Sequence, residues 1–324
     1  MLRLLARRLG FGLAIVAGVI TLTFFLLRLA PGDPVEQLLG PTATAEQIEQ
    51  QRKALGFDRP LAVQYVTWVG RFVRGDWGTS VVSGRPVRAM LGEAWPATAI
   101  LVTLSLLASY LLGIVVGVIQ AGTRKRSLDT ALSVTTVTLF AMPGYWLGLM
   151  LVMIFTYWLG VLPAFGAEGL DADFLTGWDR LVDRLAHLAL PLVTLTLIGI
   201  GGVARYVRGA MLDVRHSQFV TVARAKGLSP GQINRRHVLR NALIPVVTLL
   251  GLSLPALFSG AVFIEAIFAW PGVGRVLVEA VRGRDYPVVM AATSVSAMLV
   301  VAGNVLSDYL AGRVDPRLRT AHDH

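Results

Sequence analysis

The sequence predicts an all-α integral membrane protein with six transmembrane helices and with both chain termini in the cytoplasm. This prediction rests on the composition, on six long uncharged runs, and on the distribution of basic residues between those runs. Of the 324 residues, 54% are hydrophobic and only 15% are charged, whereas about 25% of an average soluble domain is charged. The mean hydropathy of +0.63 indicates likewise that most of the chain lies in lipid.

Six runs without Asp, Glu, Lys or Arg are each long enough to cross a bilayer, which takes about 20 helical residues. They cover residues 9–27, 94–123, 130–167, 185–204, 241–264 and 286–307. The third run is too long for one straight helix, and Pro143 followed by Gly144 predicts a kink or a break inside it. We count it as one span, because both termini then lie on the same side, as the charge distribution requires.

Basic residues set the orientation, because segments rich in Lys and Arg stay in the cytoplasm. With the N-terminus inside, the inner segments are 1–8, 124–129, 205–240 and 308–324. They hold more than half of the 30 Lys and Arg and a quarter of the 20 Asp and Glu, although the outer segments are longer in total. The net charge of +10 therefore follows a topology rule, and we infer no binding to nucleic acid.

The residue types argue against chemistry carried out by this chain. There is no cysteine, which excludes disulfides, thiolate metal sites and a cysteine nucleophile. The sequence lacks a Gly-x-x-x-x-Gly-Lys-Ser/Thr phosphate loop, so we expect no nucleotide hydrolysis by this chain. It also lacks a His-Glu-x-x-His motif and a pair of aspartates within the runs, so we expect neither a metal site nor an aspartyl protease.

The chain divides into three expected parts: residues 1–93, residues 94–311 and a cytoplasmic tail of residues 312–324. The first part combines the first span with a long outer segment. In that segment Thr44 is placed to cap a helix that extends to residue 55. Residues 55–78 predict an amphipathic helix on the membrane surface, because Val63, Val66, Val69, Phe72 and Val73 recur at helical spacing. We favour a cap over the spans, with direct contact to a solute as the alternative.

The second part is a core of five helices with a cytoplasmic loop at about 205–240. Residues 219–245, here called the knuckle, begin within this loop and continue into the fifth run. They form the longest polar interruption on the inner side. The knuckle carries five basic residues and no acidic residue. Gly227 is expected to end a first short helix in the left-handed conformation, and Ser229 with Pro230 is expected to begin a second. The sequence therefore predicts two short helices with a sharp joint, one apolar face and one basic face.

Two strings of the knuckle, ARAKG at 223–227 and RHVLRNALIP at 236–245, resemble the cytoplasmic loop of type I ABC-importer permeases of the dipeptide/oligopeptide/nickel branch. The strings GDWG at 75–78, EAIFAWPGVGR at 265–275 and RDYPVV at 284–289 are similar to the same family, so the resemblance covers almost the whole chain. The family pattern places a glutamate where this sequence has Thr221, so a salt bridge made by that glutamate cannot be assigned here.

The resemblance implies the type I ABC importer transmembrane fold and a role as the permease subunit that forms half of a translocation pathway. It implies four kinds of partner: a second homologous permease in a heterodimer, two ABC ATPase subunits, an extracytoplasmic solute-binding protein, and the lipid bilayer of a bacterial or archaeal plasma membrane. ATP and Mg would be bound by the ATPase subunits, and no cofactor by this chain. The resemblance assigns ATPase coupling to Thr221, Ala223, Arg224, Ala225, Lys226, Gly227, Ser229, Pro230, Arg236, His237, Arg240, Asn241 and Pro245.

Several questions stay open from the sequence alone. The solute is a peptide or a similar small molecule, with dipeptides, oligopeptides, nickel chelates, glutathione and sugars as alternatives. A membrane-embedded enzyme or a stand-alone channel is the alternative class of protein. Glu265 follows the start of the fifth run by about 36 Å of helix, which places it near the outer interface. A structural role for Glu265 and a role as a gate or pathway residue have equal support.

Overall fold

The computed structural model describes residues 2–29, 35, 39–40, 42–54 and 56–314; within its helices, the side chains of 2–7, 9, 244–245, 247–248, 251–252, 254–259 and 306–314 lie outside the described part. The described chain is mainly helical, without a β-strand, and Thr79 and Pro86 form an isolated antiparallel bridge. This agrees with the predicted all-α class. The chain divides into two compact units, Met1–Thr98 with Pro271–Val301 and Ala99–Trp270 with Ala302–His324.

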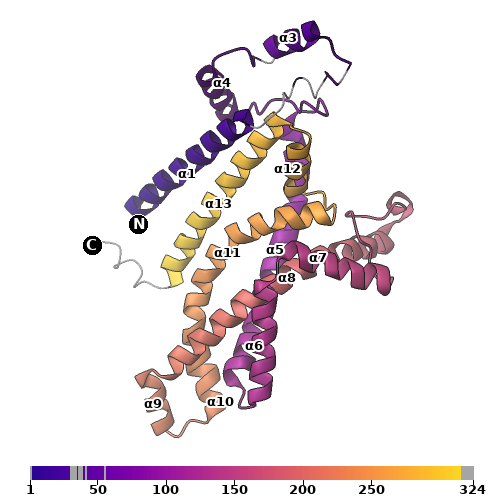
Figure 1. The fold of residues 1–324 in the computed structure, drawn as a ribbon. Helices are drawn as coiled ribbons and strands as arrows, with labels where there is room; N and C mark the ends of the chain where they lie inside the picture. The colour runs from indigo at the N-terminus through magenta and orange to yellow at the C-terminus, as the bar shows by residue number, and fades with distance from the viewer. Residues whose placement is uncertain (1, 30–34, 36–38, 41, 55, 315–324) are drawn as a thin grey trace. The chain divides into compact units, whose positions relative to one another are not determined.

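The first unit includes the long outer segment, residues 28–93. Its helices are α1 (Leu2–Leu29), α3 (Ala45–Ala54), α4 (Leu61–Val73), α12 (Val273–Arg282) and the first parts of α5 (Val87–Gly122) and α13 (Tyr286–Val314) (Figure 1). The predicted cap of α3 is confirmed. The Thr44 backbone N–H donates to Gln47 Oε1 at 2.9 Å, and the Gln47 N–H donates to Thr44 Oγ1 at 3.3 Å. Together they satisfy two backbone donors at the start of the helix.

The amphipathic helix predicted over 55–78 is shorter in the structure, where α4 begins after Pro60 and ends at Val73. Its buried side also differs from the expectation. Phe72 is buried and stacks between the rings of Trp68 and Trp77, at centroid distances of 4.9 and 5.6 Å. Three of the expected apolar residues, Val63, Val66 and Val73, are exposed instead. The aromatic rings bury more surface than the valines do, and they therefore decide which side faces the core.

The α4 helix covers part of α1 within the first unit. Tyr65 of α4 shares a hydrogen bond of 2.7 Å between its Oη and Thr21 Oγ1 of α1. The Tyr65 ring also packs edge-on against Phe24, at a centroid distance of 5.3 Å. These contacts favour the expected role of α4 as a cap over the helices.

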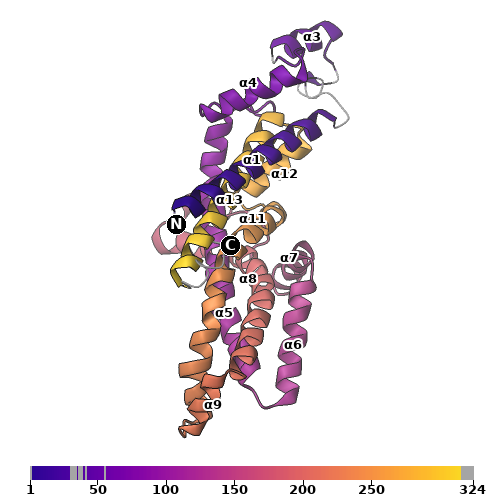
Figure 2. The same cartoon turned by 90° about the vertical axis from the view of Figure 1, so that its left-hand side faces the viewer.

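The second unit contains the rest of the membrane helices. It comprises the later parts of α5 and α13, α6 (Arg126–Ala141), α7 (Gly144–Val152), η1 (Met153–Trp158), η2 (Ala172–Phe174), α8 (Gly177–Arg215), α9 (Gln218–Ala225), α10 (Pro230–Gln232), η3 (Ile233–Val238) and α11 (Leu239–Ile267). Helix α8 is the centre of this unit, because α6, α7 and α11 all pack against it. Figure 1 and Figure 2 both show α6 running beside α8.

Four described helices are long and apolar enough to cross a membrane: Gly10–Leu29, Val87–Gly122, Gly177–Arg215 and Tyr286–Val305. A fifth span results if α6 and the α7–η1 segment count together, although they are bent by 105°. These helices cover five of the six runs, and α11 coincides with the remaining run, 241–264, although part of its side chains lies outside the described residues. The predicted break at Pro143 is confirmed, since α6 ends at Ala141 and α7 begins at Gly144.

Small residues let α8 approach its neighbours closely. A Cβ added at Gly117 of α5 would lie 2.7 Å from the Ala204 carbonyl oxygen of α8. A Cβ added at Gly201 of α8 would lie 2.6 Å from the Thr136 carbonyl oxygen and 2.9 Å from the Phe140 nitrogen of α6. In lipid, such close backbone approach supplies much of the packing energy between helices. The glycines therefore fix the spacing of α5, α6 and α8.

Candidate functional site

The knuckle connects α8 to α11, and Figure 1 shows α9 and α10 together at that connection. Helix α8 ends at Arg215, and α9 begins two residues after His216. A side-chain hydrogen bond of 3.2 Å, from Arg215 Nη2 to Asn234 Oδ1, ties the end of α8 to η3. The knuckle is therefore attached to α8 by this side-chain contact as well as through the chain itself.

The end of α9 forms a Schellman motif around Gly227. Gly227 has a φ of +76°, as predicted. Its N–H donates to the Arg224 carbonyl at 2.9 Å, and the Leu228 N–H donates to the Ala223 carbonyl at 3.3 Å. These two bonds satisfy carbonyls that the end of a helix leaves without partners. The left-handed residue turns the chain sharply, which produces the joint between the two helices.

The predicted start of the second helix is confirmed as well. Ser229 is the N-cap and Pro230 follows at the first helical position. The Ser229 N–H donates to Gln232 Oε1 at 3.0 Å, and the Gln232 N–H donates to Ser229 Oγ at 3.4 Å, which completes a capping box. Leu228 and Ile233, on either side of this box, both pack into the core of the second unit. The apolar pair fixes the direction in which the chain enters the helix.

One face of the knuckle is buried against the membrane helices. Val220 and Ala223 of α9 and Ile233 and Val238 of η3 pack in one apolar cluster with residues of α5 and α8, including Val207. Val220 and Val238 are fully buried. This packing holds both short helices in place, so the opposite face is presented as one surface.

The exposed face of the knuckle is basic. Its exposed residues include Arg224 and Lys226 at the end of α9 and Arg235, Arg236 and Arg240 along η3 and α11. No acidic residue occurs between positions 219 and 245. Such a surface can bind a negatively charged or hydrogen-bond-accepting partner.

Most of the residues with an expected coupling role lie on the exposed face of this segment. Thr221, Ala225, Ser229, Pro230 and Asn241 are exposed, and His237 is half-buried. Ala223 is buried and belongs to the packed face instead of the presented face. Pro245 lies within α11, but its side chain falls outside the described part of the chain. Gln232 and Arg235 were absent from the expected set. The four-residue spacing of Gln232, Arg236 and Arg240 indicates one shared side, and it could have identified Gln232 but not Arg235.

Glu265 is distant in sequence from the knuckle, near the end of α11. Its side chain is fully buried, and its backbone carbonyl accepts the N–H of Trp270 at 2.9 Å. Ala269, in the turn between them, has a φ of +47°, which is unusual for a residue with a side chain. The burial and the turn fit a structural role, and the role of Glu265 as a gate stays a prediction.

Two polar clusters outside the knuckle also order the segments between helices. Asp285 is buried and accepts hydrogen bonds from the Ser80 hydroxyl and, at 3.2 Å, from the Val81 N–H. In the second unit Glu168 pairs with Arg184 and Arg180. Hydrogen bonds from these two arginines lower the pKa of Glu168 below its ordinary value.

The described part of the chain holds no group of three His, Asp or Glu residues that could bind a metal.

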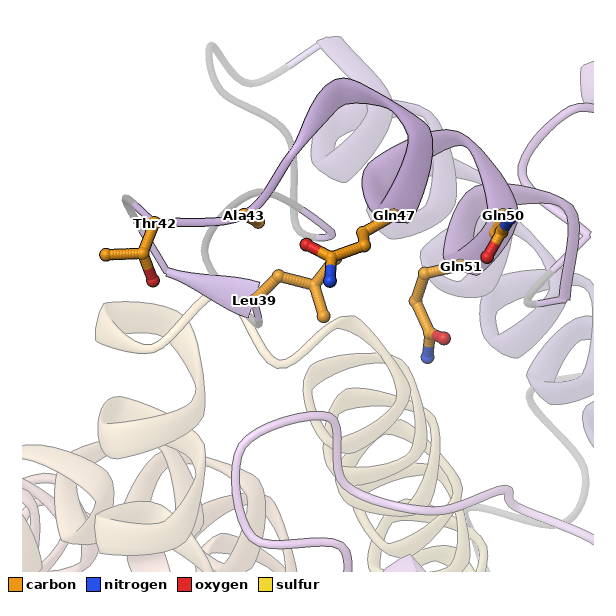
Figure 3. A pocket seen from close by; sticks show the side chains of 6 residues that line it. All are labelled: Leu39, Thr42, Ala43, Gln47, Gln50 and Gln51. Carbon is orange, nitrogen blue, oxygen red and sulfur yellow. The ribbon is translucent and has the colours of Figure 1, made fainter.

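Three cavities differ in their chemistry. One of about 460 Å³ lies against the knuckle and is lined by arginines and a histidine. Another, of about 510 Å³ in the first unit, is lined by mixed aromatic and charged residues, among them Arg28, whose guanidinium lies 4.3 Å from the Phe57 ring centroid. Figure 3 shows the third, of about 440 Å³ beside α3, with the side chains of Gln47, Gln50 and Gln51 among its lining. Its described lining residues carry no charge.

Comparison with known proteins gives consistent results along the chain. The family model described as "Binding-protein-dependent transport system inner membrane component" matches residues 113–320. The model for the N-terminal part of the corresponding membrane component matches residues 1–102. Together they account for almost all of the sequence.

Curated relatives match over their full length. The oligopeptide transport system permease protein AppB of Bacillus subtilis (strain 168) is 38% identical over 313 residues, which is 96% of this chain and 98% of AppB. The di/tripeptide transport system permease protein DppB of Pseudomonas aeruginosa (strain UCBPP-PA14) is 39% identical over 333 residues, which is 98% of this chain and 99% of DppB.

A solved structure shows the fold. A chain of the MetNI methionine ABC transporter, in an inward-facing conformation, aligns with a TM-score of 0.59 and 20% identity. The alignment covers 71% of this chain and 98% of the MetNI chain. The two chains therefore share a fold over the aligned region.

These findings decide between the classes of protein that the sequence left open. The relatives are permease proteins of transport systems, so the chain is a transport subunit and not an enzyme, and hydrolysis of ATP belongs to partner ATPases. The family description and the apolar helices place it in the inner membrane as a multi-pass protein. The chain belongs to the family of binding-protein-dependent transport system inner membrane components, as the permease subunit of a type I ABC importer.

Proposed function

We propose that this chain forms half of a translocation pathway for peptides, and that the knuckle couples that pathway to ATP hydrolysis. The peptide assignment is supported by the relatives named as oligopeptide and di/tripeptide permeases, which match over nearly their full length. The coupling assignment is carried by one observation, the joint at Gly227, where a Schellman motif and a capping box fix two short helices with a basic exposed face.

In the proposed mechanism, an ATPase subunit contacts the exposed face of α9 and the joint. The contact residues are Thr221, Arg224, Ala225, Lys226, Gly227, Ser229 and Pro230. Arg236, His237, Arg240 and Asn241 belong to the same proposed coupling segment and carry the movement along the second helix into α11. Because the opposite face packs against α8 and α5, movement of the ATPases is transmitted to the membrane helices through that apolar contact. Ala223 belongs to the packed face, so its proposed role is to transmit this movement. Pro245 lies further along the chain, within α11.

The complete transporter would contain two permeases, two ATPases and a solute-binding protein. We propose that the second permease is a homologue, so that the pathway lies between two different chains. ATP and Mg would be bound by the ATPase subunits. The binding protein would deliver solute on the outer side, where the segments 28–93, 168–184 and 265–285 lie in the proposed topology. Nickel chelates, glutathione and sugars stay alternatives to a peptide as the solute.

The proposed topology has six spans, both termini in the cytoplasm, and a division into residues 1–93, 94–311 and 312–324. Its support is the distribution of charge between the uncharged runs. A reporter of cytoplasmic location fused after Arg126 is expected to be active, and one fused at Gly169 is expected to be inactive. Fusions to a reporter that works only outside the cytoplasm provide the control, because they should give the opposite pattern. The reverse pattern in both sets would contradict the six-span model.

Assembly with ATPases tests the proposed function directly. Purified alone, this chain is expected to hydrolyse no ATP, because it lacks a phosphate-binding loop. Expressed with the genes that accompany it, it should co-purify with two ATPase chains and one further permease, and the complex should hydrolyse ATP faster when loaded binding protein is added. The measurement is ATPase activity and subunit stoichiometry of the purified complex. Hydrolysis by the isolated chain, or a complex without ATPases, would contradict the proposal.

A further inference from the structure

The cavity against the knuckle is lined almost entirely by hydrogen-bond donors. It measures about 460 Å³, and its lining residues are Leu228, Gln232, Arg235, Arg236, His237 and Arg240. The orientation of the Gln232 amide is fixed by the capping box. Its Oε1 accepts the Ser229 N–H at 3.0 Å, and because a backbone N–H can only donate, the amide NH₂ group is left for other acceptors. The cavity therefore presents guanidinium and amide donors and no carboxylate.

The charges of this cavity have no counter-charge within the described part of the chain. Arg235, Arg236 and Arg240 make no ion pair with any described residue, and no acidic side chain lines the cavity. Like charges held within one small cavity repel one another, and a bound anion removes that repulsion. Guanidinium groups also match phosphate oxygens in geometry, because they donate two parallel hydrogen bonds. The lining is thus suited to a phosphate group.

The position of the cavity along the chain indicates where the phosphate comes from. Gln232, Arg236 and Arg240 follow one another at intervals of four residues, so they lie along one side of the path from α10 through η3 into α11. Arg240 is the last charged residue before the uncharged run 241–264. Phospholipid headgroups lie at that boundary, and basic pockets at the ends of membrane helices bind anionic headgroups.

We propose that this cavity binds the phosphate of an anionic phospholipid headgroup, with Arg235 and Arg236 as the main ligands and Arg240 at the edge of the hydrocarbon. Arg224 and Lys226, on the α9 side of the joint, do not line the cavity. The lipid would therefore occupy the α11 side of the knuckle and leave the α9 side for the ATPase. This inference goes beyond the coupling proposal, and lipid binding is measured on the permease chain alone, with ATPase chains added only as a competitor.

Binding is measured by native mass spectrometry of the full chain in detergent micelles that contain dimyristoyl phosphatidylglycerol or, separately, dimyristoyl phosphatidylcholine. The wild-type chain should retain phosphatidylglycerol in preference to phosphatidylcholine. The double variant Arg235→Gln/Arg236→Gln should bind phosphatidylglycerol more weakly, by about fivefold for each cation removed. The control is Arg224→Gln/Lys226→Gln, which removes the same charge from the same knuckle outside the cavity and should change the affinity less than about twofold.

Four outcomes would overturn the proposal. Equal loss in both double variants would mean that diffuse positive charge, and no built site, attracts the lipid. Unchanged binding in Arg235→Gln/Arg236→Gln would place the lipid elsewhere. Displacement of the lipid by millimolar inorganic phosphate would identify a free-phosphate site in place of a headgroup site. Displacement by added ATPase chains would assign the cavity to the protein interface. Lipid retained in the presence of both phosphate and ATPase would support the headgroup assignment.

Discussion

Replacing Gly201 with alanine is expected to destabilise the folded chain, although alanine is the better helix former. At this position a Cβ would lie 2.6 Å from the Thr136 carbonyl oxygen and 2.9 Å from the Phe140 backbone nitrogen. Both atoms belong to the backbone of α6, so no side-chain rotation can relieve the contact. Overpacking of this kind typically costs about 1–3 kcal/mol. Separation of α6 from α8 should also weaken a neighbouring contact, in which the Arg205 guanidinium lies 3.9 Å from the centroid of the Phe140 ring.

Gly209 provides a matched control for this prediction. It lies in the same helix, and a Cβ at Gly209 would meet nothing within 4 Å. Because alanine is favoured over glycine in a helix by up to about 1 kcal/mol, Gly209→Ala should be neutral or stabilising. Thermal unfolding in detergent is followed by tryptophan fluorescence. The unfolding midpoint should fall below the wild-type value in Gly201→Ala and stay at or rise above it in Gly209→Ala. If Gly201→Ala melts at or above the wild-type temperature, the close α6–α8 packing described here is wrong.

Replacing Gly227 with valine is expected to disrupt coupling without disrupting membrane insertion. A Cβ at Gly227 would meet nothing within 4 Å, so steric collision with neighbours is not the cause. The cause is the φ of +76°, which costs a residue with a side chain about 1–2 kcal/mol. A β-branched residue adds to that cost. The population of the native joint should therefore fall by about 5- to 30-fold relative to competing conformations, and α10 would no longer be held at its present angle to α9.

Two further variants separate this conformational effect from other causes. Gly231→Val places the same side chain in the same knuckle, also with nothing within 4 Å, but at a residue without a positive φ. It should preserve coupling. Gly227→Asn should retain more coupling than Gly227→Val, because asparagine tolerates the left-handed conformation.

The sequence was sufficient to predict the parts of the site that depend on local chemistry. The left-handed Gly227, the Ser229 cap and the position of Pro230 each follow from the preferences of a few adjacent residues. The break at Pro143 was predictable for the same reason. Its angle of 105° was not, because the angle depends on how α7 packs against α8 and α11.

Features that depend on distant contacts were missed. The hydrogen bond between Ser80 and Asp285 joins residues separated by 205 positions. The tight position of Gly201 depends on α6, more than sixty residues earlier in the chain. On α4 the valine spacing alone suggested a buried side, but the stacked Trp68, Phe72 and Trp77 determine it. The π-helical turn η3, which helps to form the basic cavity, has no sequence pattern that would have predicted it.

The most direct test of the proposed coupling is ATP hydrolysis by the complete transporter in vesicles, measured with and without solute-loaded binding protein. Loaded binding protein should stimulate hydrolysis by the wild-type and Gly231→Val complexes but not by the Gly227→Val complex, while all three permeases insert at equal levels. Stimulation of the Gly227→Val complex to the wild-type level, at normal expression, would show instead that the knuckle is a basic inner loop without a role in coupling.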